Sequence, residues 1–235
     1  MTKVYLIRHA FTPANNARYN NQEGLWKIAK DKDMPIEKEY GVQQALELGE
    51  FLNGLKGKIL ILASPYFRVQ QTLKYALSKM HGDYEIKTVD DLVEFNSGVH
   101  YAHTVDEVLR MYPESKKYFE EAEKDLENAV YTGGESRNQV KARVKNIALE
   151  IQRLATINKY NYILVFGHGT VNHYIYYHLT GEYIGHDMMN CEVVSVTDKK
   201  SLFVPVAFVP KGFMVDIDEY INDEKTNDKV KILNK

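Results

Sequence analysis

Apolar and polar residues follow two different periods along this chain, and the two periods take turns. Apolar runs and extended segments typical of strands occur at 3–9, 58–65, 84–95 and 160–169. Segments with apolar residues every three or four positions, as in amphipathic helices, occur at 40–55, 66–80, 133–158 and 170–181. Strands that alternate with helices favour parallel pairing and helices on both faces of the sheet. We therefore expect an α/β protein, a three-layer α/β/α sandwich around a mostly parallel central sheet.

The remaining segments depart from this alternation. Residues 191–197 and 201–208 have the character of two further strands with no helix between them. The middle segment, 96–132, is mostly helical and rich in charge, so we expect it to cap the domain rather than to join its core. The stretch 216–235 is polar and has no clear period, which predicts a weakly attached C-terminal tail behind a single domain of residues 1–215.

Polar residues with chemical potential follow three of the expected strands. Arg8 and His9 come directly after the first strand, the segment from Ser64 to Arg68 follows the second, and His168 follows the strand at 160–169. In open α/β sheets the ligand site lies outside the carboxyl ends of the strands. The topology therefore predicts that two histidines and two arginines meet in one cleft.

Such a cleft suits a phosphate group. Two guanidinium groups offer planar forks of donors that match phosphate oxygens and stay protonated. An imidazole kept neutral by nearby positive charge can attack phosphorus, and a second, protonated histidine would hold charge on the transferring group. The leaving oxygen needs a proton donor, and Glu94, which ends the third extended segment, is the best-placed carboxyl group.

Several sequence blocks, in order, carry a resemblance to a known family. The stretch LIRHAFTPAN resembles the Arg-His-Gly signature of the histidine phosphatase superfamily, the phosphoglycerate mutase-like family, with Arg8, His9, Thr12 and Asn15 in register. The later blocks of the family are matched by GVQQALELGEFL, ASPYFRVQQT, LVEFNSG, GGES and VFGHGT. The matches span roughly residues 4–197. The resemblance implies the phosphoglycerate mutase-like form of the α/β/α fold.

The resemblance also implies roles for individual residues. His9 would be the nucleophile that becomes phosphorylated, and Glu94 would act first as an acid and then as a base. The residues that would bind the phosphate are Arg8, Thr12, Asn15, Arg68, His168 and Gly169. Of these, Arg8, Arg68 and His168 would also take part in catalysis.

The chain departs from the family pattern in two places. Ala10 stands where the family commonly has glycine, a change that a backbone with negative φ accepts. The loop 16–40 holds more residues than is usual there, and we expect it to contribute to a substrate lid. The candidate lid residues are Arg18, Tyr19, Trp26 and Lys27.

The family contains both mutases and phosphatases, and the segment after Glu94 separates them. Phosphoglycerate mutases have a basic, aromatic segment there and a pair of adjacent arginines that grips the substrate carboxylate. This chain has FNSGVHYAH and a single Arg110, so we favour a phosphatase acting on a small phosphorylated metabolite. Mutase-type phosphoryl transfer stays open as an alternative. A phospho-ligand sensor without activity is less favoured, because a sensor would need neither the nucleophile nor the acid.

The cap offers three candidate substrate contacts, His100, Tyr101 and His103. Packing inside the cap is the simpler interpretation of both histidines. A metal site on the helix at 170–181 is not expected, because His168, His173 and His178 are spaced by five residues and do not share a helix face. No cofactor is implied.

Composition adds mainly exclusions. The formal net charge of −2 gives no support for a nucleic-acid partner. No apolar run approaches the ~18 residues of a membrane span, and the N-terminus lacks the pattern of a signal peptide. Cys191 is the only cysteine, so no intramolecular disulfide can form. We expect a cytoplasmic protein with no membrane partner, and the aromatic content is compatible with a homodimer.

Overall fold

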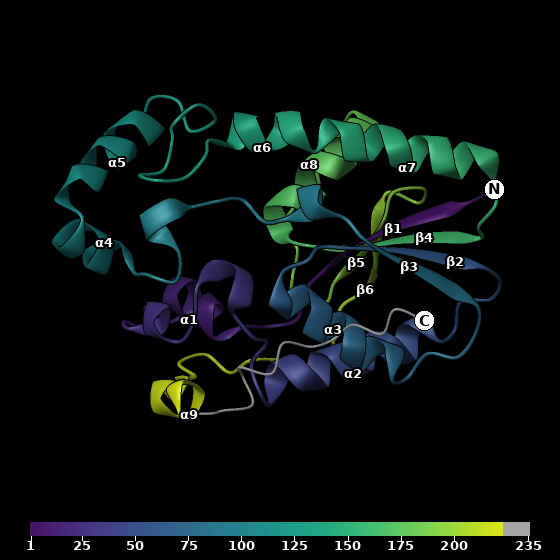
Figure 1. The fold of residues 1–235 in the computed structure, drawn as a ribbon, viewed down its shortest axis with the longest axis horizontal. Coiled ribbons are helices and arrows are strands. Elements are labelled where there is room, and N and C mark those ends of the chain that lie inside the picture. Colours follow the sequence, from purple (N-terminus) through teal and green to yellow (C-terminus); the bar gives the residue numbers. More distant parts are fainter. Residues whose placement is uncertain (223–235) are drawn as a thin grey trace.

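The computed structural model describes residues 1–222 and places a six-stranded sheet at their centre (Figure 1). The strands lie in the order β3-β2-β4-β1-β5-β6. The first four are parallel to one another, whereas β5 is antiparallel to β1 and β6 is antiparallel to β5. The strands are β1 (Lys3–Arg8), β2 (Ile59–Ala63), β3 (Tyr84–Thr88), β4 (Tyr162–Gly167), β5 (Val193–Ser195) and β6 (Lys200–Phe203).

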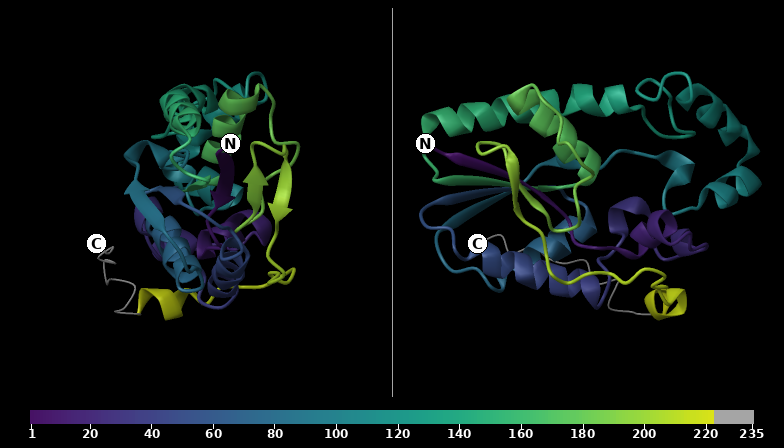
Figure 2. Two further views of the ribbon diagram at one scale, coloured as in Figure 1. Left: turned by 90° about the vertical axis from the view of Figure 1, so that its right-hand side faces the viewer. Right: turned by 180° about the vertical axis from the view of Figure 1, so that it is seen from behind.

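Helices cover both faces of this sheet, which confirms the three-layer sandwich (Figures 1 and 2). On one face lie α6 (Arg137–Arg143), α7 (Lys145–Ile157) and α8 (Gly169–Thr180), and on the other lie α2 (Tyr40–Leu52) and α3 (Phe67–Leu77). Parallel strands need such cover because both of their faces are apolar. No helix in the described residues is long and apolar enough to cross a membrane.

The two layers enclose two separate apolar cores. Successive side chains of a strand point to opposite faces. Accordingly, Val4 and Leu6 of β1 pack into the core with α6, α7 and α8, while Tyr5 and Ile7 pack into the core with α2 and α3. Burying one such side chain contributes about 1.5–3 kcal/mol. The two cores therefore hold β1 in the sheet from both faces.

The segment 133–158 forms two helices, not the single long helix that its periodicity predicts. α6 and α7 meet at Val144, and Ser136 caps the start of α6. Val140 and Ile151 are nevertheless both buried in one core with Val144. The apolar positions keep a common face across the break, which is why the periodicity alone did not reveal it.

Two of the expected strands are shorter than the apolar pattern suggests. β3 ends at Thr88 and is followed by the 3-10 turn Asp90–Leu92, so the rest of the segment 84–95 leaves the sheet. The last strand ends at Phe203, two residues before Pro205. Proline has no N–H to donate to a neighbouring strand. Because β3 ends at Thr88, Glu94 lies on a loop beyond the sheet.

The cap segment, 96–132, extends beyond the carboxyl ends of the parallel strands (Figure 1). It contains α4 (Val105–Met111) and α5 (Lys116–Ala122). At its neck, Gly98 adopts a φ of +54°, and a Cβ on this residue would collide with the returning chain at Thr132. Glycine is needed here because it allows both the left-handed backbone and the close approach.

The expected tail begins as an attached helix. α9 (Ile217–Ile221) packs against the loop 16–40, and Tyr220 is only 3% exposed. The Tyr220 hydroxyl accepts a hydrogen bond from a backbone N–H of that loop at 2.9 Å. The expectation of weak attachment is thus wrong for residues 216–222, and residues 223–235 lie outside the described part.

Candidate active site

Three neighbouring parallel strands bring the chemically active side chains together. In the sheet order, β4 lies between β2 and β1, so the carboxyl ends of these strands are adjacent. Arg8 and His9 lie at the end of β1, Ser64 follows β2, and His168 follows β4 at the start of α8. Arg68 lies in the first turn of α3. The two arginines and two histidines predicted from the sequence therefore share one buried site.

His9 presents one ring nitrogen to the site. Its Nδ1 lies 2.8 Å from the Ala10 carbonyl oxygen, which can only accept, so Nδ1 carries the proton. Its Nε2 accepts a hydrogen bond from Arg68 Nε at 3.3 Å. Burial lowers the pKa of His9 well below its usual value, and the charges of Arg68 and Arg8 lower it further. The ring is therefore neutral near pH 7, with a lone pair on Nε2.

Arg8 contributes a buried positive charge beside His9. Its Nη1 donates to the Met188 carbonyl at 2.5 Å, and both Nη atoms lie 3.3 Å from the hydroxyl of Tyr19. Its Nε is buried with no hydrogen-bond partner among the described residues. A buried donor without a partner is costly unless a ligand satisfies it. Tyr19, predicted as a lid residue, thus contacts the buried guanidinium of Arg8.

Arg68 is the second buried guanidinium, with 4% of its surface exposed. Its Nη1 donates to the backbone oxygen of Asp31 at 2.6 Å and to the Asp31 carboxylate at 2.8 Å. The ring of Tyr66 lies under the guanidinium, 4.9 Å from its central carbon. These contacts hold Arg68 from two sides.

His168 lies edge-on to His9, with ring centroids 5.2 Å apart. Its Nε2 lies 2.9 Å from the Ser64 hydroxyl oxygen, and its Nδ1 is buried with no partner among residues 1–222. Burial lowers the pKa of His168 well below its usual value, and the charges of Arg68, His9 and Arg8 add to this. A protonated His168, considered from the sequence, is therefore not the state of the unliganded site.

The turn after β1 carries two further candidates, Thr12 and Asn15. Thr12 precedes α1 (Pro13–Tyr19), and its backbone N–H and hydroxyl donate to Asn15 Oδ1 at 3.0 and 3.1 Å. Asn190 Nδ2 donates to the same oxygen at 3.4 Å. Because Oδ1 is occupied, the amino group of Asn15 is the part of this side chain left to donate to a ligand.

Three small residues near the site, Ala10, Gly167 and Gly169, differ in how tightly their neighbours pack against them. Ala10 has no positive φ, as expected, and its N–H donates to Thr72 Oγ1 at 2.9 Å. Of the two glycines that flank His168, Gly167 is sterically required, since a Cβ there would lie 2.6 Å from Asn172 Oδ1. At Gly169 a Cβ would lie 3.7 Å from Arg8 Nε, an ordinary contact. Gly169 is therefore at the site without being forced by packing.

Glu94 lies within reach of the same charges. Burial raises the pKa of Glu94 above its usual value and the charge of Asp31 adds to this, while a hydrogen bond from the Phe95 N–H and the charges of Arg68 and Arg8 oppose it. A carboxyl group that keeps its proton to higher pH is suited to act as an acid.

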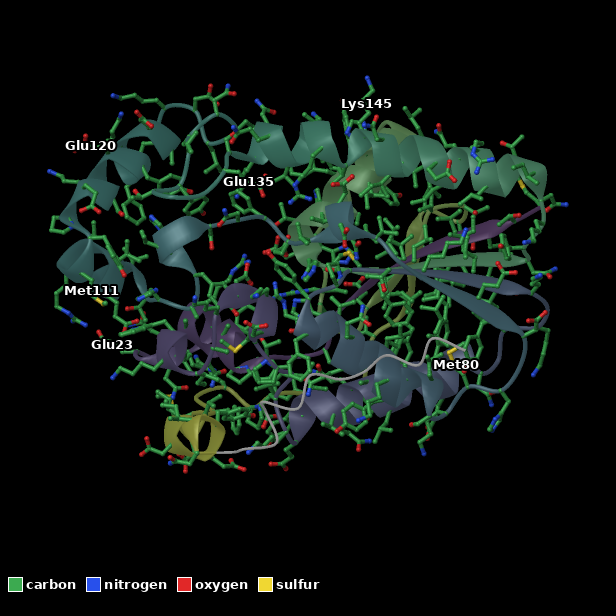
Figure 3. All side chains as sticks on the ribbon, viewed as in Figure 1. Glu23, Met80, Met111, Glu120, Glu135 and Lys145 are labelled. Atoms are coloured by element: carbon green, nitrogen blue, oxygen red, sulfur yellow. The ribbon has the colours of Figure 1, made fainter. Side chains whose placement is uncertain are left out.

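The loop that carries Glu94 is fixed from α6. Arg143 donates to the backbone oxygens of Asp91 at 2.8 Å and of Glu94 at 3.1 Å, and it forms an ion pair with Glu135 at 3.1 Å. Glu135 also accepts a hydrogen bond from the N–H of Asn96 at 2.8 Å. Figure 3 shows Glu135 just before α6, where the chain returns from the cap. Through Glu135, the GGES segment thus helps to position the loop that carries Glu94.

The cap and the loop 16–40 meet over the site. The ring of Trp26 stacks on His103 with centroids 5.3 Å apart, and Arg110 pairs with Glu23 at 3.1 Å. The N–H of Gly24 donates to the carboxylate of Glu107 in α4 at 2.8 Å. Glu23 and Met111, labelled in Figure 3, mark this junction between the loop and α4.

The three cap candidates separate in the structure. His100 packs among aromatic rings, 4.7 Å from Tyr131 between centroids, and burial lowers its pKa to about 4. His103 is engaged in the stack with Trp26. Burial raises the pKa of Tyr101; the charge of Arg68 opposes this effect and that of Asp31 adds to it. The Tyr101 hydroxyl is buried without a partner in the described residues. Packing thus accounts for His100, and Tyr101 lies within range of the charges of Arg68 and Asp31.

Sequence reasoning missed two residues that contact Arg68, namely Asp31 and Tyr66. Asp31 belongs to a run of alternating charges, KDKD, that looks like an ordinary solvated turn. Tyr66 lies inside a block recognised only for its arginine. No group of three or more potential metal ligands occurs among the described residues.

Solved structures with the same fold come from bacteria and a protist. A putative alpha-ribazole-5'-P phosphatase from Escherichia coli is 22% identical over 85% of this chain and 93% of that chain, with a TM-score of 0.65. A mycobacterial glucosyl-3-phosphoglycerate phosphatase is 17% identical over 83% and 89%, with a TM-score of 0.62. A phosphoserine phosphatase from Entamoeba histolytica, in complex with 3-phosphoglyceric acid, is 24% identical over 83% and 90%, with a TM-score of 0.58.

Sequence comparison places the chain more directly. No curated protein matches it at a significant level. The family model of the histidine phosphatase superfamily, branch 1, matches residues 4–205 and therefore includes both histidines, both arginines and the Glu94 loop. With this match over most of its length, and with two arginines and two histidines gathered at the carboxyl ends of the parallel strands, the chain belongs to the histidine phosphatase superfamily.

Proposed function

We propose that this protein is a phosphomonoester hydrolase that works through a phosphohistidine at His9 on a small phosphorylated metabolite. The observation that carries the proposal is the state of His9: a neutral, buried ring whose Nε2 lone pair faces the guanidinium of Arg68. A nucleophile placed directly beside a buried cation suits an anionic substrate.

In the proposed first step, the Nε2 lone pair of His9 attacks phosphorus and the ester P–O bond breaks. Glu94 gives its proton to the leaving alkoxide, so the alcohol departs neutral. Arg8 and Arg68 hold the phosphoryl oxygens through the transfer. In the second step, the Glu94 carboxylate takes a proton from water as the water attacks phosphorus. The P–N bond breaks, and inorganic phosphate leaves while His9 regains its lone pair.

Water, rather than a second phosphorylated acid, is the proposed acceptor. A mutase must hold a substrate carboxylate, and this chain has no pair of adjacent arginines in the cap. Arg110, the cap arginine considered from the sequence, forms an ion pair with Glu23 at the cap junction. The three solved structures described above also have phosphatase in their names, which agrees with the choice.

The proposal is tested by phosphate release from a panel of phosphomonoesters with a chelator present. Sugar phosphates, phosphoserine and glycerol phosphates supply different leaving groups, and His9→Ala serves as the inactive control. A parallel reaction contains 3-phosphoglycerate with a trace of 2,3-bisphosphoglycerate. We expect release that survives chelation and disappears in His9→Ala. Mutase turnover without phosphate release would refute the proposed hydrolase activity. Absence of turnover in both reactions would favour a ligand sensor.

A further inference from the structure

Asp31 makes a contact with the phosphate-binding machinery that the proposed reaction does not use. Both its backbone oxygen and its carboxylate Oδ1 accept hydrogen bonds from Nη1 of Arg68, at 2.6 and 2.8 Å. The side chain of Arg68 is 5% exposed and that of Asp31 is 22% exposed, so this ion pair is largely shielded from water. A shielded, charge-assisted pair of this kind restricts a guanidinium far more than a surface pair does.

The contact determines which edge of Arg68 faces the nucleophile. A guanidinium has two forks of paired donors, one formed by Nη1 with Nη2 and the other by Nε with Nη2. Asp31 occupies Nη1, whereas Nε lies 3.3 Å from His9 Nε2. The fork formed by Nε and Nη2 is therefore the one left for a phosphoryl group at His9.

An acidic residue on a phosphate-binding arginine could instead be a competitor that fills the phosphate position. The geometry argues against this, because a competitor would occupy the edge that faces His9. Asp31 occupies the other edge and also uses its backbone oxygen, which cannot leave without moving the loop. The loop is itself fastened to the helix of Arg68, since the N–H of Ile36 donates to Gln71 Oε1 at 2.8 Å.

We propose that Asp31 is a positioning residue, which holds Nη1 of Arg68 so that the fork of Nε and Nη2 is aimed at the phosphoryl group on His9. This inference rests on the proposed function of the site. It also gives the longer loop 16–40 a role in the reaction: the loop supplies the carboxylate that orients a group on α3. A misplacement of about 1 Å in such a group can cost ~100-fold in rate.

The kinetic test compares Asp31→Ala with Asp33→Ala, which removes the same charge from an exposed position in the same 3-10 turn. We expect Asp31→Ala to lower kcat about tenfold or more, with KM unchanged or lower because a negative charge has left the site. Asp31→Asn keeps an acceptor for Nη1, so its loss is smaller. Asp33→Ala keeps the activity of the wild type. A lower KM with an undiminished kcat in Asp31→Ala would instead identify a competitor and overturn the proposal.

A double-mutant cycle decides whether Asp31 acts through Arg68. Lysine has no fork to orient, so Asp31→Ala should change kcat by less than about twofold in an Arg68→Lys background. The same fold loss in both backgrounds would refute positioning and indicate a role in the loop alone. Thermal unfolding of each variant is measured alongside, and a loss of kcat that follows loss of folded protein counts against the proposal.

The orientation can also be observed without any reaction. The Nε–H of Arg68 should give a protected signal in a ¹⁵N-edited NMR spectrum, assigned by its absence in Arg68→Lys. We expect this signal to shift or broaden in Asp31→Ala and to stay in place in Asp33→Ala. An unchanged signal in Asp31→Ala overturns the proposal. If the wild type hydrolyses no phosphomonoester, the proposed function fails, and this spectrum still decides the role of Asp31.

Discussion

Burial, together with the charges of two guanidinium groups, keeps both site histidines neutral. The charges of Arg68 and Arg8 act on His9 and His168 in the same direction as burial, and together they lower the pKa of each ring. A neutral ring is a nucleophile, whereas a protonated one is not. In the proposed reaction, the charges that would bind phosphate therefore also help to keep His9 in its nucleophilic form.

A bound dianion should reverse this effect at His168. A negative charge near the ring favours its protonated form, so the pKa of His168 rises when phosphate binds, and the complex holds the proton to higher pH. The measurement is an NMR titration of the His168 ring with and without inorganic phosphate, assigned with His168→Gln. An upward displacement of the titration curve is expected. Curves that coincide would mean that phosphate does not lie beside His168.

The raised pKa of Glu94 leads to a prediction about leaving groups. Glu94→Gln removes the proton donor, so turnover of an alkyl phosphate should fall by about 10²–10⁴-fold. An aryl phosphate leaves readily without a proton and should lose less than about tenfold. In the wild type, the alkyl reaction should slow as pH rises through the pKa of Glu94, because the acid form is lost. Equal losses on both substrates would contradict the role of acid.

The site residues at the strand ends could be identified from the sequence, because the end of a strand is visible in the local pattern of apolar residues. Arg8, His9 and His168 each follow an apolar run that any reader of the sequence would place in a sheet, and parallel topology brings such ends together. Asp31 could not be found in this way. Its partner Arg68 is 37 residues away, and the contact depends on the path of a loop that no periodicity describes.

At the level of elements, helix α6 holds the loop of the proposed acid. Arg143 binds two backbone oxygens of that loop, and Glu135 binds both Arg143 and an N–H of the loop. The position of Glu94 is therefore controlled by a helix that follows the cap in sequence.

Loss of the Glu135 contacts should misplace Glu94 and so weaken its action as the acid. Glu135→Ala is expected to lower the turnover of alkyl phosphates about tenfold and that of an aryl phosphate by much less. Glu121 is an exposed residue of the cap, and Glu121→Gln serves as the control for the loss of a surface carboxylate. The ratio of the two rates in each variant is the measurement. A uniform loss on both substrates would show that Glu135 does not act through Glu94.

Element boundaries show where periodicity stops being informative. The pattern of Val140, Val144 and Ile151 predicts one helix, yet the chain breaks between α6 and α7. A break that preserves the apolar face leaves no mark in the hydrophobic pattern. This break is a local feature of the backbone at Val144, which has a φ of −78° and a ψ of −6°.

In the whole molecule, three segments far apart in sequence pack against one another next to the site. The loop 16–40 contacts Arg8 and Arg68, the cap lies against that loop at Trp26, and α9 packs against the same loop. Periodicity predicted the sandwich and the charge-rich middle segment outside the core, and the family resemblance indicated the long loop. Their mutual packing follows from long-range contacts and could not be predicted, and the attachment of α9 was predicted wrongly.

The packing of α9 predicts an effect on substrate binding at a distance. Tyr220→Ala should destabilise the fold by about 3 kcal/mol, because it removes a buried aromatic ring. It should also raise KM, because α9 supports the loop that carries Tyr19, a contact of Arg8. Tyr220→Phe keeps the ring and is expected to cost about 1 kcal/mol with little change in KM. Urea unfolding and steady-state kinetics measure both effects. An unchanged KM in Tyr220→Ala would mean that the loop keeps its position without α9.

The most direct test of the central claim is to look for phosphate on His9. The protein is mixed with an excess of its best phosphomonoester, quenched in alkali, where a P–N bond survives, and digested for mass spectrometry. We predict one phosphoryl group on the peptide that carries His9 and none in His9→Ala, which should also lose turnover. Sustained turnover by His9→Ala, with no phosphorylated peptide from the wild type, would contradict the phosphohistidine mechanism and favour direct attack by water.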